Sequence, residues 1–192
     1  MRLDEIWSII GHGDRLDWGQ LREVRRAVIL ADAGAGKTYE LRAEASRLVS
    51  RGRAAFFIRI EYIDASFDTA FEVGSQHLFE RWLGGTEDAW FFLDSVDEAL
   101  LETPRAFEAA MRAFAGRIHD ARQRAHVYIS SRPYAWRPNL DRALIEELLP
   151  YEPPQGEPAG EQAGGRADEQ GDKKSGLQLF RLAPLDRDDI RI

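Results

Sequence analysis

Short apolar runs alternate with longer amphipathic segments along most of the chain. The apolar runs predict five strands, at residues 27–30, 54–60, 89–93, 126–130 and 177–182. Their centres are apolar at consecutive positions rather than at every second one, which is typical of strands buried on both faces of a parallel sheet. Because helical segments separate the strands, the pattern predicts a three-layer α/β/α fold around a five-stranded, mainly parallel sheet.

The segments between the strands have apolar residues at helical spacing. Four main helices are predicted, at residues 37–51, 67–82, 104–121 and 140–149. Pro104 suits the first turn of the third of these helices. Leucine and isoleucine residues at helical spacing also predict a short amphipathic helix within residues 3–10, and a second one is predicted at residues 18–25.

The length and composition indicate one domain. The chain has 192 residues, 44% of them hydrophobic, which is enough for a single α/β core spanning residues 1–192. Residues 150–176 are rich in Pro, Gly, Glu and Gln and almost free of large apolar side chains, so they are predicted to form a flexible acidic insertion. A further helix predicted after Pro184 is cut short at Ile192, and we expect the chain to be a fragment of a longer protein.

Charge and cysteine content narrow the possible functions. The net charge is −7, which argues against a dedicated nucleic-acid-binding protein. The absence of cysteine excludes disulfides, cysteine-ligated zinc and thiol catalysis. No segment approaches the roughly 18 apolar residues that span a bilayer, and the acidic N-terminus resembles no targeting peptide. We therefore expect a cytoplasmic protein without a membrane partner.

A glycine-rich turn joins the first predicted strand to the next helix. Residues 31–38 read ADAGAGKT and match the phosphate-loop pattern GxxxxGK[ST], except that Ala31 replaces the first glycine. This pattern combines backbone N–H groups curved around phosphates, a helix N-terminus that attracts anions, a phosphate-binding lysine and a magnesium-binding hydroxyl. The predicted nucleotide-binding residues are Asp32, Ala33, Gly34, Ala35, Gly36, Lys37 and Thr38. Thr38 is also predicted to bind Mg²⁺, and Ala31 fits the strand end if its φ is negative.

The use of lysine strengthens this prediction. The chain has 26 basic residues, and only Lys37, Lys173 and Lys174 are lysines. The last two lie in the predicted insertion, so the folded part uses arginine at every basic position except 37. A phosphate loop needs a compact ammonium on a flexible stem at this position, and the planar guanidinium of arginine suits it poorly.

The third predicted strand is followed by acidic residues. Asp94 comes directly after the apolar run AWFFL, which is the form of a Walker B strand. Ligands of open α/β sheets gather at the carboxyl ends of strands, so we predict that Asp94 and Thr38 hold Mg²⁺ from two sides. Hydrolysis also needs a group that positions water, and we predict Glu98 or Asp97 for this role, with Glu98 preferred. The alternative is that both acids only cap the following helix.

The fourth predicted strand ends in polar residues at the same edge of the sheet. Arg132 follows this strand and is predicted to contact the γ-phosphate, the role called sensor 1. The alternative for Arg132 is an ordinary surface position in a loop. Tyr134 and Trp136 are expected to be packing residues, and the alternative is that they stack on adenine.

The nucleotide is inferred by exclusion. Ras-type GTPases recognise guanine through NKxD or TKxD, and the chain contains neither sequence. ATP with Mg²⁺ is therefore the predicted cofactor pair.

Three segments together resemble one family. ADAGAGKT, FFLDSVDEA and YISSRP are similar to the Walker A, Walker B and sensor 1 signatures of NACHT-type STAND ATPases, and LFRLAPLDRDDI resembles the strand and turn that close that core. The resemblance covers residues 24–149 and 177–192. It implies an ATP-dependent molecular switch that hydrolyses slowly, self-associates in the full-length protein and, in bacteria, often serves antiviral defence.

Two other functions stay open on the sequence. One is an AAA+-like remodelling or nucleic-acid-translocating ATPase, which needs pore loops and an arginine finger that the sequence does not reveal. The other is a non-hydrolysing nucleotide-binding module. It is favoured by Ser95, which stands directly after Asp94 where many ATPases have a glutamate.

Overall fold

The computed structural model describes residues 7–9, 15–63, 66–94, 104–152 and 176–182. These residues form one sheet of eight strands in the order β2-β1-β8-β3-β7-β6-β4-β5. The five central strands are parallel: β8 (Gln178–Leu182), β3 (Arg26–Leu30), β7 (Ala125–Ser131), β6 (Ala89–Asp94) and β4 (Ala54–Arg59). They are the five strands that the apolar runs predict, and the predicted mainly parallel α/β architecture is confirmed.

Three short antiparallel strands extend the sheet, so the predicted number of five strands was wrong. They are β1 (Trp7–Ile9), β2 (Arg15–Leu16) and β5 (Phe71–Val73). Each has only two or three residues, which is too short for a sequence period to show. The helix predicted within residues 3–10 was also wrong at β1, because Trp7–Ile9 pairs with β8 and this tertiary pairing overrides the local helical spacing.

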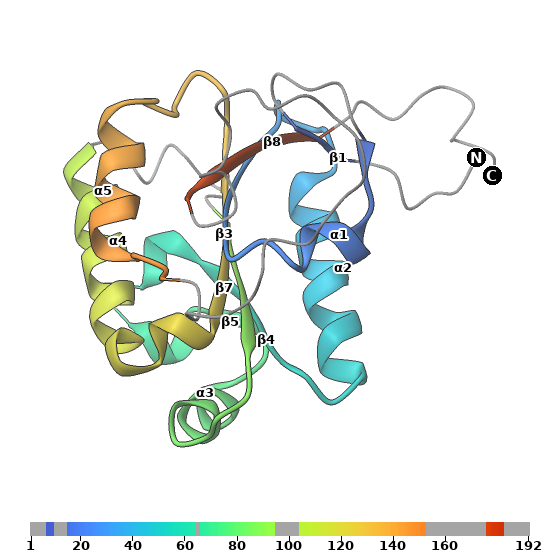
Figure 1. The fold of residues 1–192 in the computed structure, drawn as a ribbon, viewed down its shortest axis with the longest axis vertical. Coiled ribbons are helices and arrows are strands. Elements are labelled where there is room, and N and C mark those ends of the chain that lie inside the picture. Colours follow the sequence, from blue (N-terminus) through green and yellow to red (C-terminus); the bar gives the residue numbers. More distant parts are fainter. Residues whose placement is uncertain (1–6, 10–14, 64–65, 95–103, 153–175, 183–192) are drawn as a thin grey trace.

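Helices cover both faces of the sheet, as Figure 1 shows. One face carries α1 (Trp18–Leu21) and α2 (Lys37–Ser50). The other face carries α4 (Pro104–Arg117) and α5 (Leu140–Leu148), and α3 (Gln76–Leu83) packs against the same core. Within the described ranges, no helix has the length and apolar character of a membrane-spanning segment.

The segment predicted as one helix at 67–82 is divided into three elements. A 3₁₀ helix at Phe67–Thr69 leads into β5, and α3 begins only at Gln76. Gly74 separates β5 from α3 with a φ of +85°, a conformation that other residues rarely adopt. The Ser75 hydroxyl then accepts a hydrogen bond from the Leu78 N–H and caps α3. Gly74 therefore ends β5, and Ser75 starts α3.

Alternate side chains of the central strands fill two separate cores. Phe56, Phe91 and Ile129 face the core shared with α3, α4 and α5. Phe57 and Tyr128 face the core under α1 and α2. Burial on both faces explains why these strands are apolar at nearly every central position.

Two further predictions lie wholly or mostly outside the described residues. Residues 153–175 contain nearly all of the predicted acidic insertion, and residues 183–192 contain the predicted final helix. Both stay predictions.

Candidate functional site

The glycine-rich turn lies between β3 and α2, at the carboxyl edge of the parallel sheet. Gly34 and Gly36 have φ values of +77° and +81°, and Gly36 directly precedes the first residue of α2. A Cβ atom at either glycine would meet no other atom within 4 Å, so conformation rather than space requires glycine here. No described residue other than glycine has a positive φ, so φ is negative at Ala31 and alanine fits this strand end.

The first turn of α2 carries the two side chains of the motif. Lys37 is its first residue and is 9% exposed. Thr38 follows, and its Oγ1 donates a hydrogen bond of 2.8 Å to Oδ2 of Asp94. The predicted residues Asp32, Ala33 and Ala35 lie in the turn itself, before the helix. The loop and the strand-end carboxylate are therefore in direct contact although 56 positions separate Thr38 from Asp94.

Asp94 is the last residue of β6 and is fully buried. Its second oxygen, Oδ1, accepts a hydrogen bond from the hydroxyl of Ser130 on β7. The motif pattern does not single out Ser130. The signal that identifies it is the register: Leu93 lies opposite Ile129, so the next residues along the two parallel strands are Asp94 and Ser130.

This arrangement fits a magnesium ion bound together with phosphates. The two described hydrogen-bond donors to Asp94 are neutral hydroxyls, and a carboxylate beside a hydroxyl supplies the hard oxygen ligands that Mg²⁺ prefers. Among the described residues, no group of three or more His, Asp or Glu side chains could hold a metal ion by itself. Magnesium usually has few protein ligands and takes the others from phosphates and water, so a site of this kind is sufficient.

Arg59 adds a cation to the same row of strand ends. It ends β4 and pairs in register with Asp94, so both side chains project from the same face of the sheet. Its Nε lies 2.9 Å from Oε1 of Glu72, and Glu72 also pairs with Arg42 of α2. The Arg59 charge is thus engaged by a carboxylate of β5. Its polar position at the end of an apolar strand is the sequence signal that could have identified it.

Arg132 lies just after β7, at the predicted edge of the sheet. Its Nη1 donates a hydrogen bond of 2.7 Å to the hydroxyl of Tyr134. Trp136 is 6% exposed and packs in the core under α4 and α5, so its predicted packing role is confirmed. Tyr134 is 74% exposed, and its predicted packing role was wrong because it contacts the Arg132 guanidinium at the surface instead. The contact of Arg132 with a γ-phosphate stays a prediction.

The predicted water-positioning acids, Asp97 and Glu98, lie outside the described residues, as does Ser95. Their roles stay predictions.

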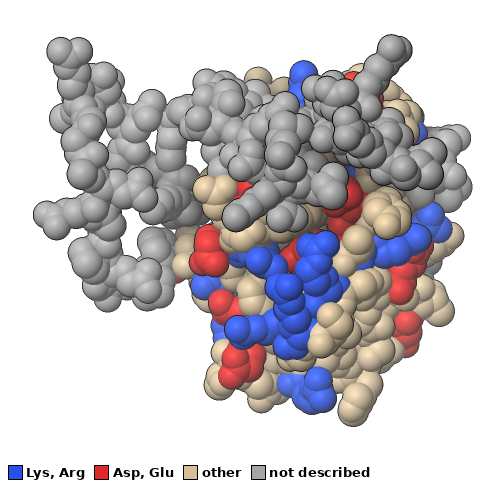
Figure 2. All heavy atoms as spheres, turned by 90° about the vertical axis from the view of Figure 1, so that its right-hand side faces the viewer, with Lys and Arg blue, Asp and Glu red and all other residues tan. Residues whose placement is uncertain are grey.

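The face formed by α1 and α2 carries many arginine side chains, interspersed with acids (Figure 2). Glu44 of α2 is fully buried among them and pairs with Arg22 at 3.0 Å and with Arg47. Burial raises the pKa of Glu44, and the two arginines act in the opposite direction. The pair between Arg22 and Glu44 joins the residue after α1 to the middle of α2, and so holds the helix that begins at Lys37.

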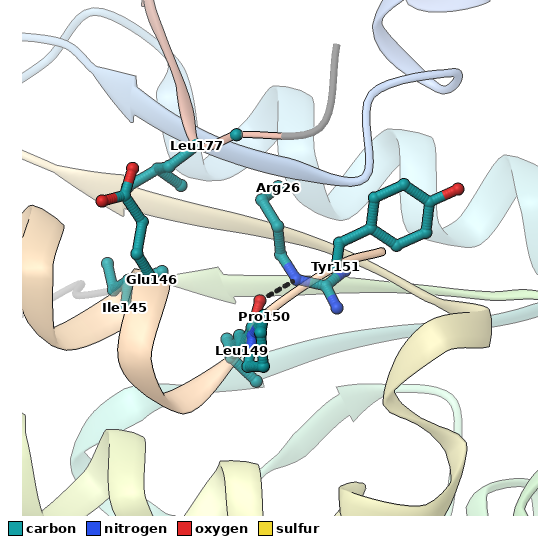
Figure 3. A pocket seen from close by; sticks show the side chains of 8 residues that line it. Arg26, Ile145, Glu146, Leu149, Pro150, Tyr151 and Leu177 are labelled. Carbon is teal, nitrogen blue, oxygen red and sulfur yellow. Dashed lines mark hydrogen bonds between the residues drawn. The ribbon is translucent and has the colours of Figure 1, made fainter. Parts of the chain in front are cut away.

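A small pocket of about 200 Å³ lies at the opposite, amino edge of the sheet (Figure 3). It is lined by Arg26, Ile145, Glu146, Leu149, Pro150, Tyr151, Gly176 and Leu177. The Arg26 guanidinium donates to the carbonyl oxygens of Leu149, Arg25 and Arg122 at 2.8 to 2.9 Å, and also to that of Ala125. The Arg26 guanidinium in this pocket is thus engaged by the backbone.

Comparisons with known proteins add little to this description. No family model matches the sequence, and neither does any curated protein. Among solved structures, the chain resembles the cytoplasmic domain of the Thermomonospora curvata Type VII Secretion ATPase EccC, with 12% identity and a TM-score of 0.41. The similarity covers 95% of this chain but only 26% of that one. So distant a likeness carries no functional weight, and the resemblance to NACHT-type ATPases rests on the motif residues alone.

Proposed function

We propose that this chain is a P-loop nucleotide-binding domain that binds ATP together with Mg²⁺. The observation that carries the proposal is the hydrogen bond between Thr38 and Asp94, which joins the helix after the glycine-rich turn to the end of an apolar strand. A hydroxyl and a carboxylate that meet beside a helix N-terminus are the two protein ligands expected for nucleotide-bound magnesium.

Each part of the site has a distinct task in this proposal. The turn at Gly34 and Gly36 presents backbone N–H groups to the phosphates, and the N-terminus of α2 adds the positive end of its dipole. Lys37 places its ammonium against the phosphate oxygens. Thr38 and Asp94 orient the magnesium ion, which neutralises phosphate charge when bound.

The finer proposal is a slowly hydrolysing switch of the NACHT or STAND type. The three motif segments support it by resemblance. Glu98, or Asp97, positions the attacking water, and Arg132 contacts the γ-phosphate and reports its presence. Loss of the γ-phosphate then releases this contact, so that nucleotide state is converted into a local change of conformation.

A non-hydrolysing module is the second candidate, and Ser95 favours it. In this case the nucleotide stabilises the domain without turnover, and neither Asp97 nor Glu98 has a catalytic role.

Binding and turnover together separate these candidates. The wild-type chain is titrated with Mg-ATP and Mg-GTP, and phosphate release is then measured for wild type, Glu98→Gln and the control Glu108→Gln, which changes a half-exposed glutamate of α4. The switch predicts preference for ATP and slow turnover that falls about 100-fold or more in Glu98→Gln only. Tight binding with no turnover in the wild type would favour the non-hydrolysing module. Absence of binding by either nucleotide would refute both.

A further inference from the structure

The end of β7 carries a buried hydroxyl that packing alone does not require. Ser130 is 1% exposed, and it projects from the sheet face whose core is formed by Phe57, Phe92 and Tyr128. An alanine would fill nearly the same space in such surroundings. A polar side chain in a buried position is stabilised only when it makes a hydrogen bond, and the described acceptor of Ser130 is Oδ1 of Asp94.

The two oxygens of Asp94 therefore have different partners. Oδ1 is bound by Ser130 of β7, and Oδ2 is bound by Thr38 of α2. A carboxylate at the end of a strand can rotate about its terminal torsion, which has broad minima. The hydrogen bond from Ser130 restricts this rotation and keeps Oδ2 directed toward the first turn of α2.

We propose that Ser130 is a positioning residue for the magnesium ion. It holds the Asp94 carboxylate so that Oδ2 and the Thr38 hydroxyl face the same point beside the phosphate loop. The inference rests on the proposed function, since it assigns a role within the same nucleotide site. Groups that orient metal ligands without touching the metal commonly change metal affinity by about 10- to 100-fold when they are removed.

The neighbouring serine provides a matched comparison. Ser131 is the next residue of β7, so its side chain projects from the other face of the sheet. Its hydroxyl donates to the carbonyl oxygen of Arg132 at 3.2 Å and makes no described contact with Asp94. The two hydroxyls differ in partner but not in chemistry, and only Ser130 is expected to act on magnesium.

A purely structural role for Ser130 makes a different prediction. If the hydroxyl only satisfies a buried acceptor, its removal lowers the stability of the fold but leaves the effect of magnesium on nucleotide binding unchanged. The informative quantity is therefore the magnesium gain, defined as the ratio of the ATP dissociation constant in EDTA to that in Mg²⁺.

The test measures this gain for the full chain by calorimetry with ATP. The variants are Ser130→Ala, Ser130→Cys, Ser130→Thr and the control Ser131→Ala. We expect the gain to fall about 10-fold or more in Ser130→Ala, with little change in EDTA affinity. Ser130→Cys preserves the packing if the alanine variant does not fold, and its weak S–H donor should lower the gain as well. Ser130→Thr, which keeps the hydroxyl, should restore it, and Ser131→Ala should retain the wild-type gain.

Two results would overturn the inference. If wild type gains affinity with Mg²⁺ and Ser130→Ala or Ser130→Cys gains equally, Ser130 does not position the ion, while the proposed function stands. If wild type binds no ATP in either condition, the proposed function fails and the inference fails with it.

Discussion

Each edge of the sheet buries a charged side chain, and the groups that bind the charge differ between the two edges. At the amino edge, Arg26 is 3% exposed, and its guanidinium donates to four backbone carbonyl oxygens. At the carboxyl edge, Asp94 is fully buried, and its described donors are the side-chain hydroxyls of Thr38 and Ser130. The charge of Arg26 is thus bound by backbone groups, and the charge of Asp94 is bound by side-chain groups.

We interpret Arg26 as a structural charge and, under the proposed function, Asp94 as a ligand-binding charge. Backbone carbonyls cannot leave Arg26 without opening the chain between α4 and β7 or the end of α5, so they serve the fold. Burial, together with the neighbouring Arg25, lowers the pKa of Arg26 to about 10, which still leaves it charged at neutral pH. The Thr38 hydroxyl at Asp94 can turn its oxygen toward a cation without any change of backbone. This difference supports the proposal that a ligand binds at the carboxyl edge.

The largest effect on the fold is expected from Arg26→Met. This change removes the donor shared by the carbonyl oxygens of Arg122, Ala125 and Leu149. We expect the free energy of unfolding to fall by about 3 kcal/mol, because several buried acceptors lose a charged donor at once. Urea unfolding followed by circular dichroism measures the loss, and ATP affinity of the folded protein should be unchanged.

Arg25→Met is the matched control. Arg25 lies beside Arg26 on the same edge but is partly exposed and pairs with Asp88 at 3.1 Å. Removal of the Arg25 guanidinium should lower the free energy of unfolding by less than about 1 kcal/mol. If the two variants lost equal free energy of unfolding, burial among backbone carbonyls would not set Arg26 apart from Arg25. A large loss of ATP affinity in Arg26→Met would contradict its purely structural role.

A smaller, pH-dependent effect is expected from His126, also at the amino edge. Burial and the charge of Arg25 lower its pKa below the ordinary 6.5, although the Val24 carbonyl and Asp88 act in the opposite direction. The unfolded chain then binds more protons than the folded one just below pH 6.5, so stability should fall as the pH is lowered through this value. Above pH 6.5, His126 is neutral in both the folded and the unfolded chain, so its titration takes nothing from the stability.

The comparison of wild type with His126→Phe isolates this effect. Phenylalanine keeps a ring that can stack on Trp90, which lies 4.9 Å from the His126 ring between centroids. The difference in unfolding free energy between the two proteins should change between pH 7.5 and about 5.5, with wild type losing more stability on acidification. A constant difference across this range would show that His126 does not titrate as described.

The sequence predicted the central strands well because burial on both faces leaves a continuous apolar run. It failed where tertiary contacts decide the structure. Residues 3–10 have apolar residues at helical spacing, but residues 7–9 join the sheet by pairing with β8. Phe71–Val73 pairs with β4 over too few residues to produce a period.

In the candidate site too, residues that carry a motif were predicted, and residues placed only by tertiary contacts were not. The spacing of ADAGAGKT and the position of Asp94 after an apolar run have a direct chemical meaning, and the structure brings Thr38 and Asp94 together. Ser130 lies within the YISSRP segment, but the segment does not distinguish it from Ser131, and Arg59 belongs to none of the three motif segments. Arg59 is marked in the sequence only as a polar residue at the end of an apolar run, and the parallel register is what places both residues on either side of Asp94. A neighbour across strands cannot be derived from one sequence until the strand order is known.

Lys37 and the turn that precedes it are proposed to bind the phosphates of ATP, and calorimetry with Mg-ATP tests this most directly. Wild type should bind, and Lys37→Ala should bind about 100-fold more weakly or not measurably, equivalent to about 2.8 kcal/mol or more. Without nucleotide, the two proteins should unfold at similar temperatures, and Arg53→Ala, which removes an exposed cation beyond the far end of α2, should bind like wild type. Equal affinity of Lys37→Ala and wild type, or no heat of binding in wild type, would contradict the account.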